Sequence, residues 1–191
     1  MLQIVKEKND FYTSVERALT EIDPNWASYD GVVIVGSHSP ENIQQKLDLL
    51  RITRENKIPT LGICLGMQLM AVEFSKNVLG IKDATSQEFG PGVWVVEKMK
   101  DLRVGIFDVG KQKESHWHHF KVGEKFADLF KVQFETQMTD NVLESMRLKN
   151  HPFFCGVQYH PEYQSSKDKP HPLLVEFIKT CKKSNSNNQK A

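Results

Sequence analysis

The sequence predicts an α/β fold with a mostly parallel central sheet and helices on both faces. Along the first half of the chain, short apolar runs rich in β-branched residues alternate with amphipathic segments of helical spacing, which is typical of parallel sheets. The run 31–36, Gly-Val-Val-Ile-Val-Gly, is apolar throughout, as expected for a strand that is buried on both faces. The 191 residues also come near the usual size of one α/β domain.

Composition and charge favour a globular protein that acts on small molecules. Hydrophobic residues make up 39% of the chain and charged residues 26%, and the formal net charge is +1. This balance predicts no binding to nucleic acid or to a membrane surface. No apolar stretch approaches the roughly 20 residues that cross a bilayer, and no signal peptide is visible, so we expect a cytoplasmic protein. We expect a single domain over residues 1–181 and a flexible polar tail over 182–191.

The elements of the first half follow from periodicity and from local stop signals. Val15, Leu19 and Ile22 have helical spacing, and Ser39-Pro40 has the form of a helix start with a serine cap. Glycine and proline interrupt the apolar runs between the helices. The expected elements are strand 2–5, helix 11–22, strand 31–36, helix 39–56, strand 58–63 and helix 65–74.

The second half has weaker signals. Residues 90–150 contain several short runs typical of strands, including 93–96 and 130–134, whose order in a sheet the sequence leaves open. Residues 153–159 have the composition of a last core strand. The apolar stripe from Leu173 to Cys181 predicts a closing helix.

The three cysteines fit neither a disulfide framework nor a zinc site, because they are odd in number and widely spaced. Cys155 lies in an apolar run and Cys181 continues the closing helical stripe, so both are expected to be buried. Cys64 has a different setting, since it lies within Gly62-Ile63-Cys64-Leu65-Gly66 between a predicted strand and a predicted helix. This pattern is typical of a nucleophile on a strained turn.

Chemistry at such a turn follows from its geometry. The start of the helix favours a thiolate at Cys64, and the Leu65 amide is placed to stabilise an oxyanion. A thiol nucleophile needs a base, and His160 follows the last predicted core strand, with Glu162 two residues later. We predict a Cys64, His160 and Glu162 triad, because the carboxyl ends of parallel strands meet at one crevice.

These residues resemble the class I glutamine amidotransferases, and more narrowly the glutaminase domain of CTP synthase. The match extends over most of the chain and includes the nucleophile segment, a substrate-binding segment, the catalytic-base segment and the first helix, which are residues 54–68, 84–89, 151–178 and 11–19. The resemblance implies a flavodoxin-like fold and hydrolysis of glutamine through a glutamyl thioester with release of ammonia. It implies no cofactor.

The resemblance also implies roles for pocket residues. Gln68 and Glu88 would recognise the amino-acid end of glutamine, and the loop at Gly36 and Ser37 would help bind the oxyanion. Two positions depart from the family pattern: Ser37 replaces a glycine, and His119 replaces a substrate-contacting arginine. No metal is expected at the histidines around His119.

Several functions remain open at this point. The leading one is a glutaminase that supplies ammonia to a separate synthetase, since the chain has no phosphate-binding Gly-x-x-x-x-Gly-Lys motif and is not expected to make CTP alone. A related thiol hydrolase that acts on a γ-glutamyl compound or another amide is the second. The third is a catalytically impaired homologue kept for regulation or binding, which the departures at Ser37 and His119 suggest.

Overall fold

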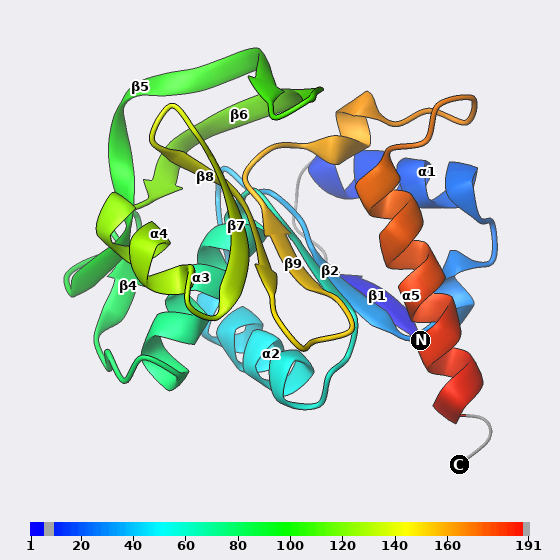
Figure 1. Ribbon diagram of the computed structural model, residues 1–191, viewed down its shortest axis with the longest axis horizontal. Coiled ribbons are helices and arrows are strands. Elements are labelled where there is room, and N and C mark those ends of the chain that lie inside the picture. The colour runs from blue at the N-terminus through cyan, green and yellow to red at the C-terminus, as the bar shows by residue number, and fades with distance from the viewer. Residues whose placement is uncertain (6–9, 189–191) are drawn as a thin grey trace.

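A central six-stranded sheet organises the computed structural model, which describes residues 1–5 and 10–188 (Figure 1). The strand order is β1-β2-β3-β9-β8-β7, in which the first four strands run parallel and the last two pairings are antiparallel. The strands are β1 (Leu2–Val5), β2 (Gly31–Ile34), β3 (Thr60–Ile63), β7 (Phe134–Thr139), β8 (Val142–Leu148) and β9 (Phe154–Val157).

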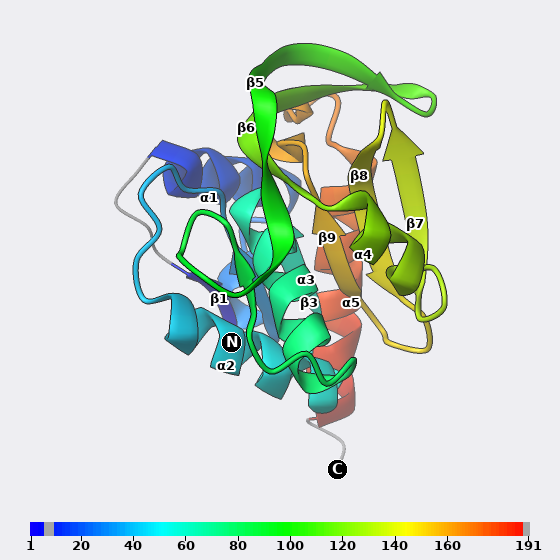
Figure 2. The same ribbon diagram turned by 90° about the vertical axis from the view of Figure 1, so that its left-hand side faces the viewer.

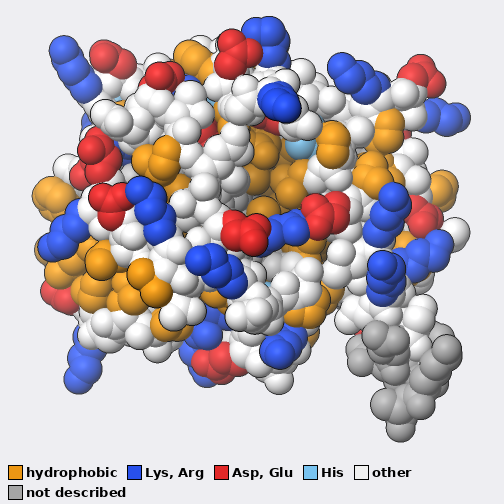
Figure 3. Space-filling view, viewed as in Figure 1, with side chains coloured by type: hydrophobic (Ala, Val, Ile, Leu, Met, Phe, Trp, Pro, Cys, Tyr) orange, Lys and Arg blue, Asp and Glu red, His pale blue; other side chains and the backbone are white. Residues whose placement is uncertain are grey.

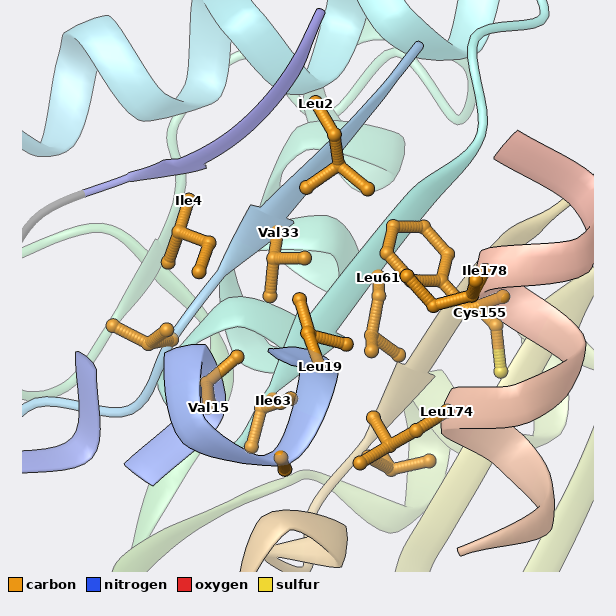
Figure 4. Packing of buried hydrophobic residues seen from close by; sticks show 14 of the residues in the cluster. Leu2, Ile4, Val15, Leu19, Val33, Leu61, Ile63, Cys155, Leu174 and Ile178 are labelled. Carbon is orange, nitrogen blue, oxygen red and sulfur yellow. The ribbon is translucent and has the colours of Figure 1, made fainter. Parts of the chain in front are cut away.

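Helices cover both faces of this sheet, as predicted. Alternate residues of one strand separate into two buried clusters: Val33 belongs to one and Ile34 to the other. On the first face, α1 and α5 direct side chains such as Leu19 and Ile178 toward Val33 and Leu61 (Figure 4). On the opposite face lie α2 and α3. The helices are α1 (Asp10–Ile22), α2 (Ile43–Glu55), α3 (Leu65–Asn77), α4 (Glu124–Phe130) and α5 (Pro172–Asn188), with short 3-10 turns at Trp26–Ser28 (η1) and Pro161–Gln164 (η2).

A second, three-stranded sheet extends from the α3 side of the molecule. It consists of β4 (Ala84–Ser86), β5 (Val93–Val109) and β6 (Gln112–Val122), and the long β5–β6 hairpin projects away from the central sheet (Figures 1 and 2). The inner end of this hairpin contributes Val95, Val96 and Val122 to the core around α3. The middle of the chain therefore forms a layer of its own above the strand ends.

Charged side chains of both signs are mixed over the surface seen in Figure 3. Among residues 1–5 and 10–188, no helix combines the length and the apolar character that crossing a membrane requires.

Helix α2 begins later than the sequence predicts, at Ile43 instead of Ser39. The residue before it, Asn42, has a left-handed backbone with φ 53°, and its carbonyl accepts the Lys46 amide at 3.2 Å. Ser39 donates its backbone N–H to the Ser37 hydroxyl at 3.1 Å and so belongs to a loop. Asparagine tolerates the left-handed conformation better than serine does, which places the turn at Asn42.

The predicted strand at 130–134 is also wrong in its first part. Phe130 ends helix α4, and β7 starts only at Phe134. Both rings pack on Phe74 of α3, with centroids 5.8 and 4.7 Å from the Phe74 ring. The apolar run thus consists of a helix end and a strand start that meet at one buried aromatic residue.

The closing helix extends beyond Cys181 to Asn188, so residues 182–188 of the expected flexible tail are helical. No proline or glycine interrupts this segment. The side chain of Asn185 donates to the Ser28 carbonyl at 3.1 Å, and Lys182 lies 3.6 Å from Asp23. These contacts fasten the extra turns to the loop after α1. Residues 189–191 lie outside the described residues.

Gly66→Ala is expected to destabilise the fold by roughly 3 kcal/mol, because overpacking against rigid backbone cannot relax. A methyl group at Gly66 would collide with the Ile34 carbonyl oxygen and lie 3.1 Å from the Ile34 carbonyl carbon. Urea unfolding measures the loss. Gly123→Ala is the matched control, since the closest contact of its methyl would be the flexible end of Glu97 at 3.3 Å. Equal midpoints for the two variants would contradict the close packing of α3 on β2.

Candidate active site

Cys64 lies at the sharp turn between β3 and α3. Its backbone has φ 53° and ψ −104°, a strained conformation for a residue with a side chain. The Cys64 amide donates to the Val157 carbonyl at 2.7 Å, which fastens the turn to the neighbouring strand β9. A methyl at Gly62 would come within 2.6 Å of the Gly66 backbone, so the turn requires the small residues predicted around Cys64.

His160 and Glu162 follow β9 directly and are both fully buried. The Nδ1 atom of His160 lies 2.8 Å from Glu162 Oε1, and a carboxylate accepts, so Nδ1 carries the proton of this bond. Arg17 donates to the Glu162 carbonyl at 2.9 Å, and the His160 amide donates to the Ser115 carbonyl at 2.8 Å. The pair is therefore held from both α1 and β6.

The charge on His160 is set by competing effects. Burial lowers the pKa of His160, but the Glu162 carboxylate and the Cys64 sulfur outweigh burial and raise that pKa to about 10. The other ring nitrogen, Nε2, is buried and makes no hydrogen bond within the described part of the chain. This nitrogen is available for proton exchange with the thiol.

Gly36 brings the loop after β2 against both groups. A methyl at Gly36 would lie 2.9 Å from His160 Cε1 and 3.4 Å from Cys64 Cβ, so no larger residue fits between them. On another side of the imidazole, the Phe11 ring stacks at 4.8 Å between centroids. The structure thus brings Cys64, His160 and Glu162 to one place, although they come from two separate segments of the chain.

A pocket of about 250 Å³ opens in front of Cys64. The predicted pocket residues that line it are Ser37, Leu65, Gln68, Glu88 and His119. Gly36 is the one predicted pocket residue outside this lining. Burial raises the pKa of Glu88. The φ angle of Ser37 is not in the left-handed region, so a serine meets no left-handed strain at this position, where the resemblance implies a glycine.

Gln68 presents a defined side of its amide to the pocket. Its Nε2 atom donates to the Phe120 carbonyl at 3.0 Å and to Gln158 Oε1 at 3.2 Å. Because a carbonyl can only accept, the amide orientation is fixed, and Oε1 of Gln68 remains for a ligand. This atom is an acceptor suited to an ammonium group.

The neighbouring histidines make separate hydrogen bonds. His116 contacts the Glu144 carboxylate at 2.8 Å, and His118 Nδ1 donates to the Phe120 carbonyl at 2.9 Å. Burial lowers the pKa of His118 to about 3, so this imidazole is neutral. No group of three or more His, Cys, Asp or Glu side chains in the described ranges could hold a metal ion.

Gln158 was not predicted as a site residue, although it is fully buried and its Nε2 lies 3.6 Å from Cys64 Sγ. A signal was present, because Gln158 is two residues before His160, and residues two apart in extended chain point to the same side. The buried carboxylates Glu144 and Glu114, which bind His116 and His171, were not predicted either. Nothing local in the sequence indicates these pairings.

Comparisons with known proteins show the family of this chain. The family model "Glutamine amidotransferase class-I" matches residues 5–180. The chain belongs to the class I glutamine amidotransferase family. It is 34% identical to a CTP synthase of Methanoculleus marisnigri over 94% of this chain and 42% of that protein. It is 32% identical to a CTP synthase of Ruminiclostridium cellulolyticum over 92% of this chain and 42% of that protein.

The fold of this glutamine amidotransferase-type enzyme is shared with solved structures. The glutaminase domain of Trypanosoma brucei CTPS with bound acivicin aligns with a TM-score of 0.81 at 24% identity, covering 95% of this chain and 93% of that one. A protein of Thermoplasma acidophilum described as a GMP synthase component aligns with a TM-score of 0.60 at 19% identity, covering 100% and 97%. The chain spans about two fifths of the curated relatives it matches.

Proposed function

We propose that this protein hydrolyses the side-chain amide of glutamine to glutamate and ammonia, with Cys64, His160 and Glu162 as its triad. One observation carries the proposal: a cysteine on a strained strand-to-helix turn lies beside a buried histidine whose far nitrogen is bound by a carboxylate at 2.8 Å. This is the arrangement by which a thiol nucleophile is activated. The described chain would act as one glutaminase domain.

The reaction proceeds in two halves. Cys64 Sγ, having given its proton to His160, attacks the amide carbon of glutamine, and the resulting oxyanion is stabilised by backbone amides at Leu65 and the Gly36 loop. His160 then protonates the leaving nitrogen, the C–N bond breaks, and ammonia departs from a glutamyl thioester. In the second half, water gives a proton to His160 and attacks the thioester. The C–S bond breaks, His160 returns the proton to the sulfur, and glutamate leaves the restored thiol.

The rest of the pocket would bind the amino-acid end of the substrate. Gln68 Oε1 and the Glu88 carboxylate are both acceptors, and together they suit the α-ammonium group. His119 would lie near the α-carboxylate. Released ammonia would pass to a synthetase, which in this proposal is a separate protein or a further domain.

All three cysteines are free, as expected of a protein that works in the cytosol.

A second candidate substrate is favoured by the charge of the pocket. None of the described residues that line it is lysine or arginine, so a free α-carboxylate lacks a permanent cationic partner there. A γ-glutamyl compound keeps the same α-carboxylate as glutamine, so among the alternative substrates this charge favours another amide, one without a free α-carboxylate. A homologue that binds without catalysis is the remaining alternative.

The direct test is incubation of the purified protein with glutamine and, separately, with γ-glutamyl anilide and with 4-aminobutyranilide, which lacks the α-carboxylate. We expect ammonia and glutamate in equal amounts from glutamine, and addition of the glutamine analogue diazo-oxo-norleucine to the peptide that contains Cys64. Faster release of aniline than of ammonia would favour the second substrate class. Release of neither product, together with an unlabelled Cys64 peptide, would leave only the binding homologue.

A further inference from the structure

Gln158 is a buried amide that the mechanism above does not use. It directly follows β9, its side chain has no exposed surface, and its backbone N–H donates to the Glu144 carbonyl at 2.8 Å. Its side chain lies between two residues of the nucleophile segment, Cys64 and Gln68. A buried amide with both ends engaged is rigid, so its contact with the sulfur has a fixed direction.

That direction follows from one backbone carbonyl. The Phe120 carbonyl only accepts, so the group of Gln68 that faces it at 3.0 Å is the NH₂ group. The same NH₂ group lies 3.2 Å from the Gln158 side chain, which must therefore present its oxygen to Gln68. The NH₂ group of Gln158 is then the end that faces Cys64 Sγ, at 3.6 Å. These hydrogen bonds from Phe120 through Gln68 to Gln158, which we call the relay, fix the orientation of both amides. The relay therefore places a donor at the sulfur, independently of how the amide nitrogen and oxygen atoms were assigned.

The contact matters because a backbone carbonyl beside the sulfur favours the protonated thiol. The Trp117 carbonyl lies 3.9 Å from Sγ and can only accept a hydrogen bond from an S–H group. A donor on the sulfur has the opposite effect, since it stabilises the negative charge. Gln158 and His160 are the two side chains that can do so from the described part of the chain.

We propose that Gln158 is a further catalytic residue, whose amide N–H donates to the Cys64 sulfur and stabilises its thiolate. This inference rests on the proposed function and extends it to a residue outside the triad. Gln68 links the thiolate to the pocket, because its side chain lines the pocket and its Nε2 donates to Gln158. An ammonium group on Gln68 Oε1 polarises the relay and strengthens the donor at the sulfur. Substrate binding and thiolate formation are thereby coupled.

The test is the pH dependence of Cys64 alkylation by iodoacetamide, followed by mass spectrometry of the peptide that contains Cys64. In Gln158→Glu, an acceptor of the same shape replaces the donor, so alkylation at pH 7 is expected to slow by about 10-fold or more, with the profile moved to higher pH. Gln158→Met removes the donor without adding charge and is expected to slow alkylation about 3-fold. Gln137→Glu makes the same chemical change in β7 and should match the wild type.

Two outcomes separate this inference from the function on which it rests. In the first, Cys64 of the wild type is strongly reactive, and Gln158→Glu and Gln158→Met show the same pH profile of alkylation. This result would overturn the role of Gln158 and leave the glutaminase proposal intact. A wild-type Cys64 that alkylates like an ordinary exposed thiol, with no ammonia from glutamine, would overturn both. If the glutamate variant does not fold by circular dichroism, the methionine variant decides, because it keeps the length of the side chain without a charge.

Discussion

Cys64→Ala is expected to reduce the rate of ammonia release from glutamine by at least about 10⁴-fold, to the level of the blank reaction. The reason is chemical, since no thioester can form without the sulfur and the remaining groups provide only binding and oxyanion stabilisation. Steady-state ammonia release measures the effect. The small change in volume is not expected to unfold the protein, because Cys64 lies at the edge of the pocket.

Cys155→Ala is the matched control for Cys64→Ala. Cys155 is also buried, but it lies in β9, and burial raises the pKa of its thiol to about 11. This thiol is therefore unreactive at neutral pH, and its removal should leave kcat within about 3-fold of the wild type while costing some stability. Similar losses of activity in the two variants would show that the Cys64 effect is structural.

Glu162→Gln is expected to lower kcat by about 10³- to 10⁴-fold, because an uncharged amide no longer fixes the imidazole tautomer or stabilises the imidazolium. Without the carboxylate, the pKa of His160 falls from about 10, since burial is then opposed by the Cys64 sulfur alone. Measurement of kcat and KM separately should place most of the effect on kcat.

The same substitution changes how stability depends on pH. A folded-state pKa of His160 near 10 exceeds the ordinary histidine value of 6.5, so its stabilising contribution is full below pH 6.5 and disappears as pH rises through 10. The stability difference between wild type and Glu162→Gln should therefore shrink over that range.

Glu114→Gln is the matched control for Glu162→Gln, because Glu114 binds His171 in a similar buried pair at 2.9 Å, away from the sulfur. It should lose stability and retain kcat. A large fall in kcat for Glu114→Gln as well would contradict the specific role proposed for Glu162.

Much of the fold was predictable because its signals are local. The parallel strands β1, β2, β3 and β9 are short apolar runs, and α1, α3 and the start of α5 have clear helical stripes. The candidate site was accessible for the same reason. The motif around Cys64 and the His160–Glu162 pair each occupy a few consecutive residues at strand ends, and parallel strands bring such ends together. The catalytic roles of these residues stay predictions.

Other features depend on contacts between distant segments. Phe130 belongs to a helix because it meets Phe74 of α3, and residues 182–188 are helical beside the loop that contains Asp23 and Ser28. Periodicity cannot report either contact, because each partner lies in a distant part of the chain.

The sequence by itself thus determined the parallel α/β sheet, the turn at Cys64 and the adjacent His160 and Glu162, all of which follow from local periodicity and strand-end chemistry. Only the tertiary structure decided that Gln158 faces the sulfur, because its orientation depends on a carbonyl at Phe120, in another sheet. Hydrogen-bond direction is passed from group to group through space, and a linear pattern does not contain it.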